Sequence, residues 1–85
     1  MCGIIGINSK KPVSASIINS LKKLEYRGYD SAGIATLSEG FINEVKSEGR
    51  VDNLEKNSVV QNMVGTIGIG HVRWATHGLP TRINA

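Results

Sequence analysis

The sequence predicts an α+β or a layered α/β fold with about three or four strands and one well-formed helix. Three patterns predict it: a short β-branched run at 2–7, apolar residues at helical spacing over 13–25, and strand-like alternation over 66–72. With 85 residues, 40% hydrophobic and 20% charged, the chain is typical of one globular domain with a thin core. The nearly all-apolar first strand predicts burial on both sheet faces, so one covering layer would come from elsewhere.

The helix predicted at 13–25 has a regular apolar repeat and suitable ends. Pro12 precedes it, and two lysines lie in its last turn, where they complement the helix dipole. The apolar positions that would face a core are Ile17, Ile18, Leu21 and Leu24.

The middle of the chain is predicted to form a loop followed by a hairpin. Segment 26–33 is polar and punctuated by glycine, which favours a loop. Strands at 33–37 and 41–46 flank a Ser-Glu-Gly turn at 38–40, as expected of a hairpin.

The second half of the chain adds a weaker helix and a strand. In segment 51–61 the apolar spacing is poor, although Asp52 and Glu55 are spaced as a capping pair. The strand at 66–72 has glycines on one face, which predicts close approach of another backbone or a ligand there. The opposite face would carry Ile67, Ile69 and His71.

Composition excludes several classes of protein. One cysteine cannot form an internal disulfide, which predicts a reducing compartment. We expect a cytoplasmic protein with no membrane partner, because no stretch resembles a membrane span or a signal peptide. The net charge of +3 is scattered among acidic residues, so we expect no nucleic-acid partner.

Cys2 is a candidate nucleophile because it directly follows the initiator methionine. A side chain this small permits removal of Met1, which would leave a cysteine with its own α-amino group as the base. An amine with a pKa of about 8 and a thiol of about 8.5 exchange a proton readily near neutral pH. The alternative is a small buried apolar residue. A generic redox or metal role becomes attractive only if Met1 is retained.

A second candidate site lies just beyond the last predicted strand, at 73–78. The guanidinium of Arg73 suits a carboxylate, and the indole of Trp74 can wall off a small apolar stem. Thr76 and His77 can fix the orientation of a ligand. The alternative is a surface loop in which Trp74 packs and Arg73 faces water.

The 26–33 loop is a third candidate. Arg27 could approach a nucleophile at a strand end and stabilise its thiolate or a developing negative charge. The alternative is a turn in which the side chains of Asp30 and Ser31 satisfy backbone amides.

The sequence predicts no metal and no cofactor. His71 is expected to be a hydrogen-bonded core histidine, since two histidines and one cysteine do not supply metal-ligand spacing. The glycines at 65–70 lack the lysine of a phosphate loop and the spacing of a dinucleotide fingerprint.

Three motifs carry a resemblance to a known family: 1–6 (MCGIIG), 24–33 (LEYRGYDSAG) and 70–78 (GHVRWATHG). In order and spacing they resemble the start of the class II glutamine amidotransferase domain of the glutamine–fructose-6-phosphate aminotransferases, also called glucosamine-6-phosphate synthases. Purine- and asparagine-synthesis relatives share the opening Cys-Gly-Ile, but the other two motifs look like the aminosugar family. The resemblance implies an α+β N-terminal-nucleophile (Ntn) hydrolase fold, an αββα sandwich, of which residues 1–85 form an incomplete N-terminal portion.

The resemblance also implies roles for individual residues. Cys2, as the mature N-terminal residue, would attack the side-chain amide of glutamine and release ammonia for transfer to fructose 6-phosphate. Arg73 matches the residue that grips the glutamine carboxylate. Trp74, Thr76 and His77 match the loop that lines and closes over this substrate. Arg27 lies in a matching motif and is a candidate support for the nucleophile.

The chain departs from the family in length. The family's oxyanion-hole Asn-Gly pair, the aspartate that holds the glutamine amine and the sugar isomerase domains lie further on. Losing one oxyanion donor typically costs about a hundred- to a thousandfold in rate, so we expect the chain alone to be inactive. The hypotheses are a segment of an enzyme whose partner is the missing remainder, a remnant without catalysis, and a fragment of a related purine-synthesis enzyme.

Overall fold

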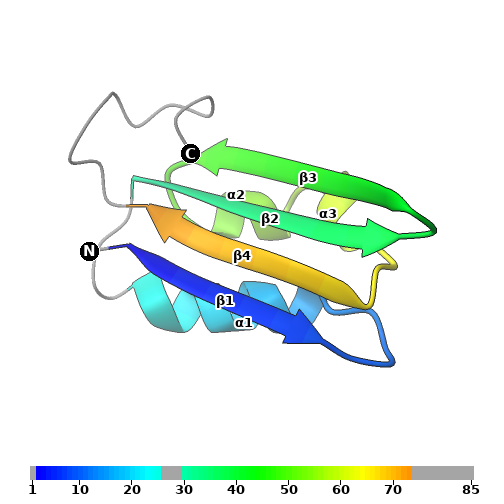
Figure 1. Cartoon of the computed structure of the whole chain (residues 1–85). Coiled ribbons are helices and arrows are strands. Elements are labelled where there is room, and N and C mark those ends of the chain that lie inside the picture. The colour runs from blue at the N-terminus through cyan, green and yellow to red at the C-terminus, as the bar shows by residue number, and fades with distance from the viewer. Residues whose placement is uncertain (1, 26–29, 74–85) are drawn as a thin grey trace.

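The computed structural model describes residues 2–25 and 30–73, which form one antiparallel sheet with helices on one side (Figure 1). The elements in chain order are β1 (Gly3–Asn8), α1 (Ser14–Leu24), β2 (Ser31–Ser38), β3 (Phe41–Glu48), α2 (Asp52–Glu55), α3 (Ser58–Gln61) and β4 (Ile67–Arg73). The strand order is β1-β4-β2-β3, and every pairing is antiparallel. The α+β prediction is therefore confirmed.

The core lies between α1 and the two central strands. Ile17 and Leu21 are fully buried on the sheet-facing side of α1, as the helical repeat predicted. They sit directly over the β4 glycines, since a Cβ on Gly70 would lie 2.5 Å from Ile17 Cγ2 and 3.0 Å from Leu21 Cδ1. A close approach exists at Gly70, but it comes from side chains of the helix and not from the backbone or ligand that the sequence predicted.

The hairpin forms as predicted, with longer strands. Ser38 pairs with Phe41, and the two residues between them have positive φ, 51° at Glu39 and 82° at Gly40. Glycine adopts this region without strain, which explains why the turn is placed here. The strand β2 begins at Ser31, so the predicted loop is shorter than expected.

The helix predicted at 51–61 is two short helices. Asn57 separates them, and its side-chain Oδ1 accepts hydrogen bonds from the backbone N–H groups of Val59 (2.8 Å) and Val60 (3.3 Å), capping α3. The expected capping pair at the start of α2 is wrong, because the position before this helix is Val51, which has no side-chain cap. None of the helices in the described part of the chain has the length and hydropathy that crossing a membrane requires.

The sheet face opposite the helices, here called the open face, carries no helix (Figure 1). From the strand register it consists of Ile4, Gly6, Asn8, Gly33, Ala35, Leu37, Ile42, Glu44, Lys46, Ile67, Ile69 and His71. Within the described residues β1 is an edge strand and Ile4 is 81% exposed on the open face, so these residues do not supply the second covering layer that the first strand predicts.

Candidate active site

Strand register brings two of the predicted site residues to one end of the sheet. Gly3 of β1 pairs with Val72 of β4, so Cys2, one residue before, and Arg73, one residue after, flank the same end of this antiparallel pair. Arg73 also pairs with Ser31, the first residue of β2. The thiol of Cys2 is exposed, and the alternative of a buried apolar cysteine is therefore wrong.

The residues on either side of 26–29 are fixed to this end of the sheet. The backbone N–H of Asp30 donates to the Arg73 carbonyl (2.6 Å), and the Asp30 carbonyl accepts from Gly49 N–H (2.8 Å). On the other side, the buried Glu25 carboxylate accepts a hydrogen bond from Val51 N–H (2.9 Å). The end of α1 and the start of β2 lie at the same end of the molecule as the start of β1 (Figure 1).

Gly3 ties the start of β1 to the end of α1. A Cβ at this position would lie 2.9 Å from Leu24 Cδ1 and 3.3 Å from Val72 Cγ2. The glycine next to Cys2 therefore lets the strand pack closely beneath the last turn of the helix. This packing fixes the position of Gly3 and, with it, the point at which the backbone of Cys2 joins the strand.

Four of the predicted site residues lie outside the described residues: Trp74, Thr76 and His77, predicted to bind substrate, and Arg27, predicted to support the nucleophile. Arg73 itself is the last residue of β4 and is partly exposed. The roles predicted for all of them stay predictions.

Two further residues lie at this end of the sheet: Glu25, for which the sequence predicted no role, and Ser31, which it predicted in a turn. Glu25 is 9% exposed and also lies 3.8 Å from Arg50 Nη2 through its Oε1, although Arg50 is far from it in sequence. Ser31 is fully buried, and its hydroxyl has no hydrogen-bond partner within residues 2–25 and 30–73. The interpretation that Ser31 satisfies a backbone amide in a turn is therefore wrong, because this residue lies in a strand.

His71 lies half-buried on the open face rather than in the core, so the core prediction for this residue is wrong. Burial lowers its pKa below the usual value, and the positive charges of Lys46 and Arg73 lower it further. The carboxylate of Glu44 opposes this shift. Histidine here favours its neutral form.

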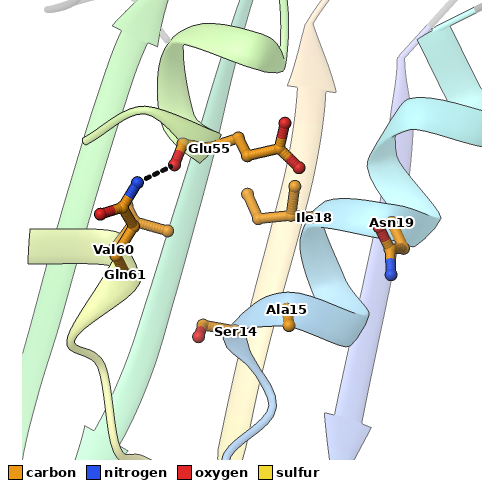
Figure 2. Close-up of a pocket in the computed structure, with 7 residues that line it drawn as sticks. All are labelled: Ser14, Ala15, Ile18, Asn19, Glu55, Val60 and Gln61. Carbon is orange, nitrogen blue, oxygen red and sulfur yellow. Dashed lines mark hydrogen bonds between the residues drawn. The ribbon is translucent and has the colours of Figure 1, made fainter. Parts of the chain in front are cut away.

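A groove of about 260 Å³ lies elsewhere, on the outer side of the helical layer (Figure 2). It is lined by Ser14, Ala15, Ile18, Asn19, Glu55, Val60 and Gln61. Gln61 Nε2 donates to the Glu55 carbonyl (3.0 Å), and the Glu55 carboxylate binds Lys22 Nζ (2.8 Å), a hydrogen bond that raises the pKa of this lysine. The groove holds none of the predicted site residues.

Within residues 2–25 and 30–73, no three histidine, cysteine or carboxylate side chains gather where a metal ion could bind. Among the predicted site residues that the structure describes, the groups at the Cys2 end of the sheet are a thiol and a guanidinium. A thiol suits nucleophilic attack, and a guanidinium suits binding of a carboxylate.

Known proteins are similar to this chain over its whole length. It is 54% identical over 85 residues to the glutamine–fructose-6-phosphate aminotransferase (isomerizing) of Bradyrhizobium diazoefficiens and also 54% identical to that of Clostridium acetobutylicum. The enzyme of Rhizobium meliloti is 53% identical. The chain spans 14% of the length of each of these relatives. No family model matches it.

A solved structure is similar to the fold. The glutamine PRPP amidotransferase from B. subtilis, complexed with ADP and GMP, aligns with 91% of this chain at a TM-score of 0.77 and 26% identity. The chain covers 17% of that protein. The expectation of an incomplete Ntn-hydrolase fold is confirmed by this neighbour.

Proposed function

Over all of its 85 residues the chain is homologous to a part of the glutamine–fructose-6-phosphate aminotransferases, and from this premise we propose that it forms the nucleophile-bearing part of a glutamine-hydrolysing site. The observation that carries the proposal is the register of β1 and β4. It puts Cys2 and Arg73 at the same end of the sheet, as a site for an amino-acid amide requires.

The proposed reaction is acyl transfer from glutamine to the thiol. Removal of Met1 frees the α-amino group of Cys2, which takes the thiol proton as sulfur attacks the side-chain carbonyl carbon. The carbon–nitrogen bond breaks, and the same amine returns the proton to the leaving nitrogen, which departs as ammonia. Water then cleaves the thioester, so that glutamate and the thiol are regenerated.

Arg73 would bind the α-carboxylate of glutamine. Its guanidinium is a planar fork that pairs with a carboxylate through two parallel hydrogen bonds. Its backbone is held by pairing with Ser31 of β2 and by the hydrogen bond from Asp30 N–H. Because the backbone of Arg73 is held in place, its side chain starts from a defined position, and a substrate bound to it would be positioned relative to the Cys2 sulfur. Trp74, Thr76 and His77 would enclose the substrate, and Arg27 would support the thiolate.

The acceptor of ammonia belongs to the same proposal. In a protein as long as its aminotransferase relatives, ammonia would pass to fructose 6-phosphate and give glucosamine 6-phosphate. The structural neighbour is a PRPP amidotransferase, which favours purine-synthesis chemistry as the second candidate. Identity of 54% with the aminosugar enzymes against 26% with this neighbour supports the first candidate.

Selective labelling of Cys2 tests the proposal without requiring turnover. The reagents are a glutamine analogue with a diazoketone in place of the amide, the same analogue as its carboxyl ester, and iodoacetamide. We expect the free carboxylate to speed labelling at least about tenfold over the ester, as the loss of a charge-assisted pair implies. This preference should vanish in Arg73→Gln.

Lys56→Gln is the matched control, because it removes one exposed positive charge elsewhere. It should keep the preference, and iodoacetamide should label all three proteins equally. Equal labelling of wild type by the analogue and its ester would overturn the role of Arg73. Mass spectrometry of the same samples shows whether Met1 has been removed, which the proposed base requires.

A further inference from the structure

Ser31 is a buried polar residue at the end of the sheet where Cys2 and Arg73 lie. Its side chain is 0% exposed, and within residues 2–25 and 30–73 its Oγ has no hydrogen-bond partner. A buried hydroxyl without a partner destabilises a fold, so packing alone does not account for a serine here.

The face of the sheet on which Ser31 lies follows from Gly33, two residues further along β2. A Cβ on Gly33 would lie 2.9 Å from His71 Nε2, so Gly33 and His71 share the open face. Side chains alternate between the two faces of a strand, which gives Ser31 the same face as its register partners Arg73 on β4 and Glu48 on β3. Ser31 therefore lies between a residue that carries a guanidinium and one that carries a carboxylate.

The backbone holds Ser31 close to Arg73. The two are register partners, and the N–H of Asp30 donates to the Arg73 carbonyl at 2.6 Å. Directly opposite residues of an antiparallel pair have Cβ atoms about 4.5–5.5 Å apart. A serine Oγ is bonded directly to Cβ, and the Nε–H of an arginine lies midway along its side chain. The Ser31 hydroxyl is therefore within reach of the middle of the Arg73 side chain.

Thr36 offers a comparison on the same strand. Within residues 2–25 and 30–73 it is the other residue with a buried side-chain oxygen that has no partner. It lies on the helix side of β2, where a Cβ on its register partner Gly68 would lie 3.0 Å from Thr36 Cγ2. Its register partner on β3 is Asn43, so neither register partner is charged. Packing over a glycine accounts for Thr36, whereas Ser31 adjoins a residue of the proposed site.

We propose that the hydroxyl of Ser31 accepts a hydrogen bond from the Nε–H of Arg73 and thereby orients the guanidinium toward the α-carboxylate of glutamine. This inference rests on the proposed function, in which Arg73 binds that carboxylate. A guanidinium that pairs end-on with a carboxylate uses N–H groups of its two terminal nitrogens, so its Nε–H can donate to a further acceptor. Ser31 is thus a positioning residue that acts on the substrate through Arg73.

Labelling of Cys2 in the whole 85-residue chain tests this role, with the diazoketone analogue of glutamine and its carboxyl ester as probes. The readout is the carboxylate preference, which is the ratio of the labelling rate of the free acid to that of the ester. Ser31→Ala removes only the hydroxyl and should lower this preference at least about threefold, because the guanidinium loses one hydrogen bond that orients it.

A merely structural role for Ser31 would change other quantities. Iodoacetamide should label Cys2 equally fast in wild type and in Ser31→Ala, because the proposed contact does not involve the thiol. Urea unfolding of Ser31→Ala should show no loss of stability, since the hydroxyl that it removes has no partner among the described residues. Thr36→Val is the matched control, because it removes the other such hydroxyl from the same strand, and it should keep the wild-type preference.

A double variant shows whether Ser31 acts through Arg73. When Ser31→Ala is added to Arg73→Gln, the free acid should label Cys2 no more slowly than in Arg73→Gln alone. Slower labelling there, an equal loss of preference in Thr36→Val, or an unchanged preference in Ser31→Ala would overturn the inference and leave the proposed function standing. A wild type that both probes label equally fast would overturn the proposed role of Arg73 and this inference with it.

Discussion

The carboxylate of Glu25 accepts a hydrogen bond of 2.9 Å from the backbone N–H of Val51, and both residues are buried. Glu25 caps the C-terminal end of α1, directly after Leu24, and Val51 immediately precedes α2. This contact therefore fixes one end of the segment that carries Arg27 to a distant part of the chain. Nothing in the local sequence around either residue predicts it.

Glu25→Ala is expected to destabilise the fold by about 1–3 kcal/mol, because it leaves the buried Val51 N–H without an acceptor. Glu25→Gln keeps an oxygen at the same place and should recover most of that loss. The ion pair with Arg50 contributes little, since the Arg50 side chain is 60% exposed. Urea unfolding followed by circular dichroism measures both. Equal losses in the two variants would show that charge, and not the hydrogen bond, stabilises this contact.

Gly70→Ala is expected to destabilise the protein by about 1–3 kcal/mol through overpacking. Its new Cβ would lie 2.5 Å from Ile17 Cγ2, and the helix would have to move away from the sheet. Gly6→Ala is the matched control, because the nearest atom to a Cβ there is Ile69 Cγ2 at 3.8 Å, an ordinary contact. Thermal unfolding of both variants measures how much stability each one loses. A loss in Gly6→Ala as large as that in Gly70→Ala would contradict the packing argument.

A feature of this fold can be predicted from the sequence when residues close to it in the chain determine it. Ile17 and Leu21 define the buried face of α1 through their spacing alone, and Gly40 marks the hairpin turn through its own conformational freedom. These features were predicted correctly because neighbouring residues determine them.

The remaining features depend on partners far away in sequence. A strand rich in isoleucine looks the same whether one face or both are covered, so the exposure of Ile4 could not be predicted from β1. Asn57 interrupts the helical segment by capping a new helix, which competes with continuing the old one. The site also depends on distant partners. The motifs identified Cys2 and Arg73 as site residues, but their placement at one end of the sheet follows from the strand order β1-β4-β2-β3, which the motifs do not contain.

Stability is expected to fall as pH decreases through the histidine range. In the folded state the pKa of His71 is lowered, mainly by burial and also by the positive charges of Lys46 and Arg73, while Glu44 opposes the shift. As the pH falls, His71 therefore takes up a proton in the unfolded chain before it does so in the folded chain. Below the unfolded pKa of about 6.5, unfolding is therefore favoured increasingly until the folded-state pKa is passed. Above that range the contribution of His71 is constant.

Urea midpoints from about pH 8 to about pH 5.5 measure this effect, and His71→Gln is the matched variant because it cannot titrate. The difference in free energy of unfolding between wild type and His71→Gln should shrink toward low pH. The pairing environment of His71, with Ile4 on β1 and Gly33 on β2, supplies no further charge. Parallel pH profiles for the two proteins would contradict the assignment.

The 85-residue chain alone is expected to release no detectable glutamate from glutamine, even with Met1 removed. It spans 14% of its aminotransferase relatives, and the resemblance places the oxyanion donors further along such proteins. Each missing donor lowers the rate by about a hundred- to a thousandfold, because negative charge on the tetrahedral intermediate is left without hydrogen bonds. A coupled glutamate assay with Cys2→Ala as the blank measures this directly. Glutamate release that disappears in Cys2→Ala would contradict the prediction and would show that Cys2 and its neighbours in this chain form a working site by themselves.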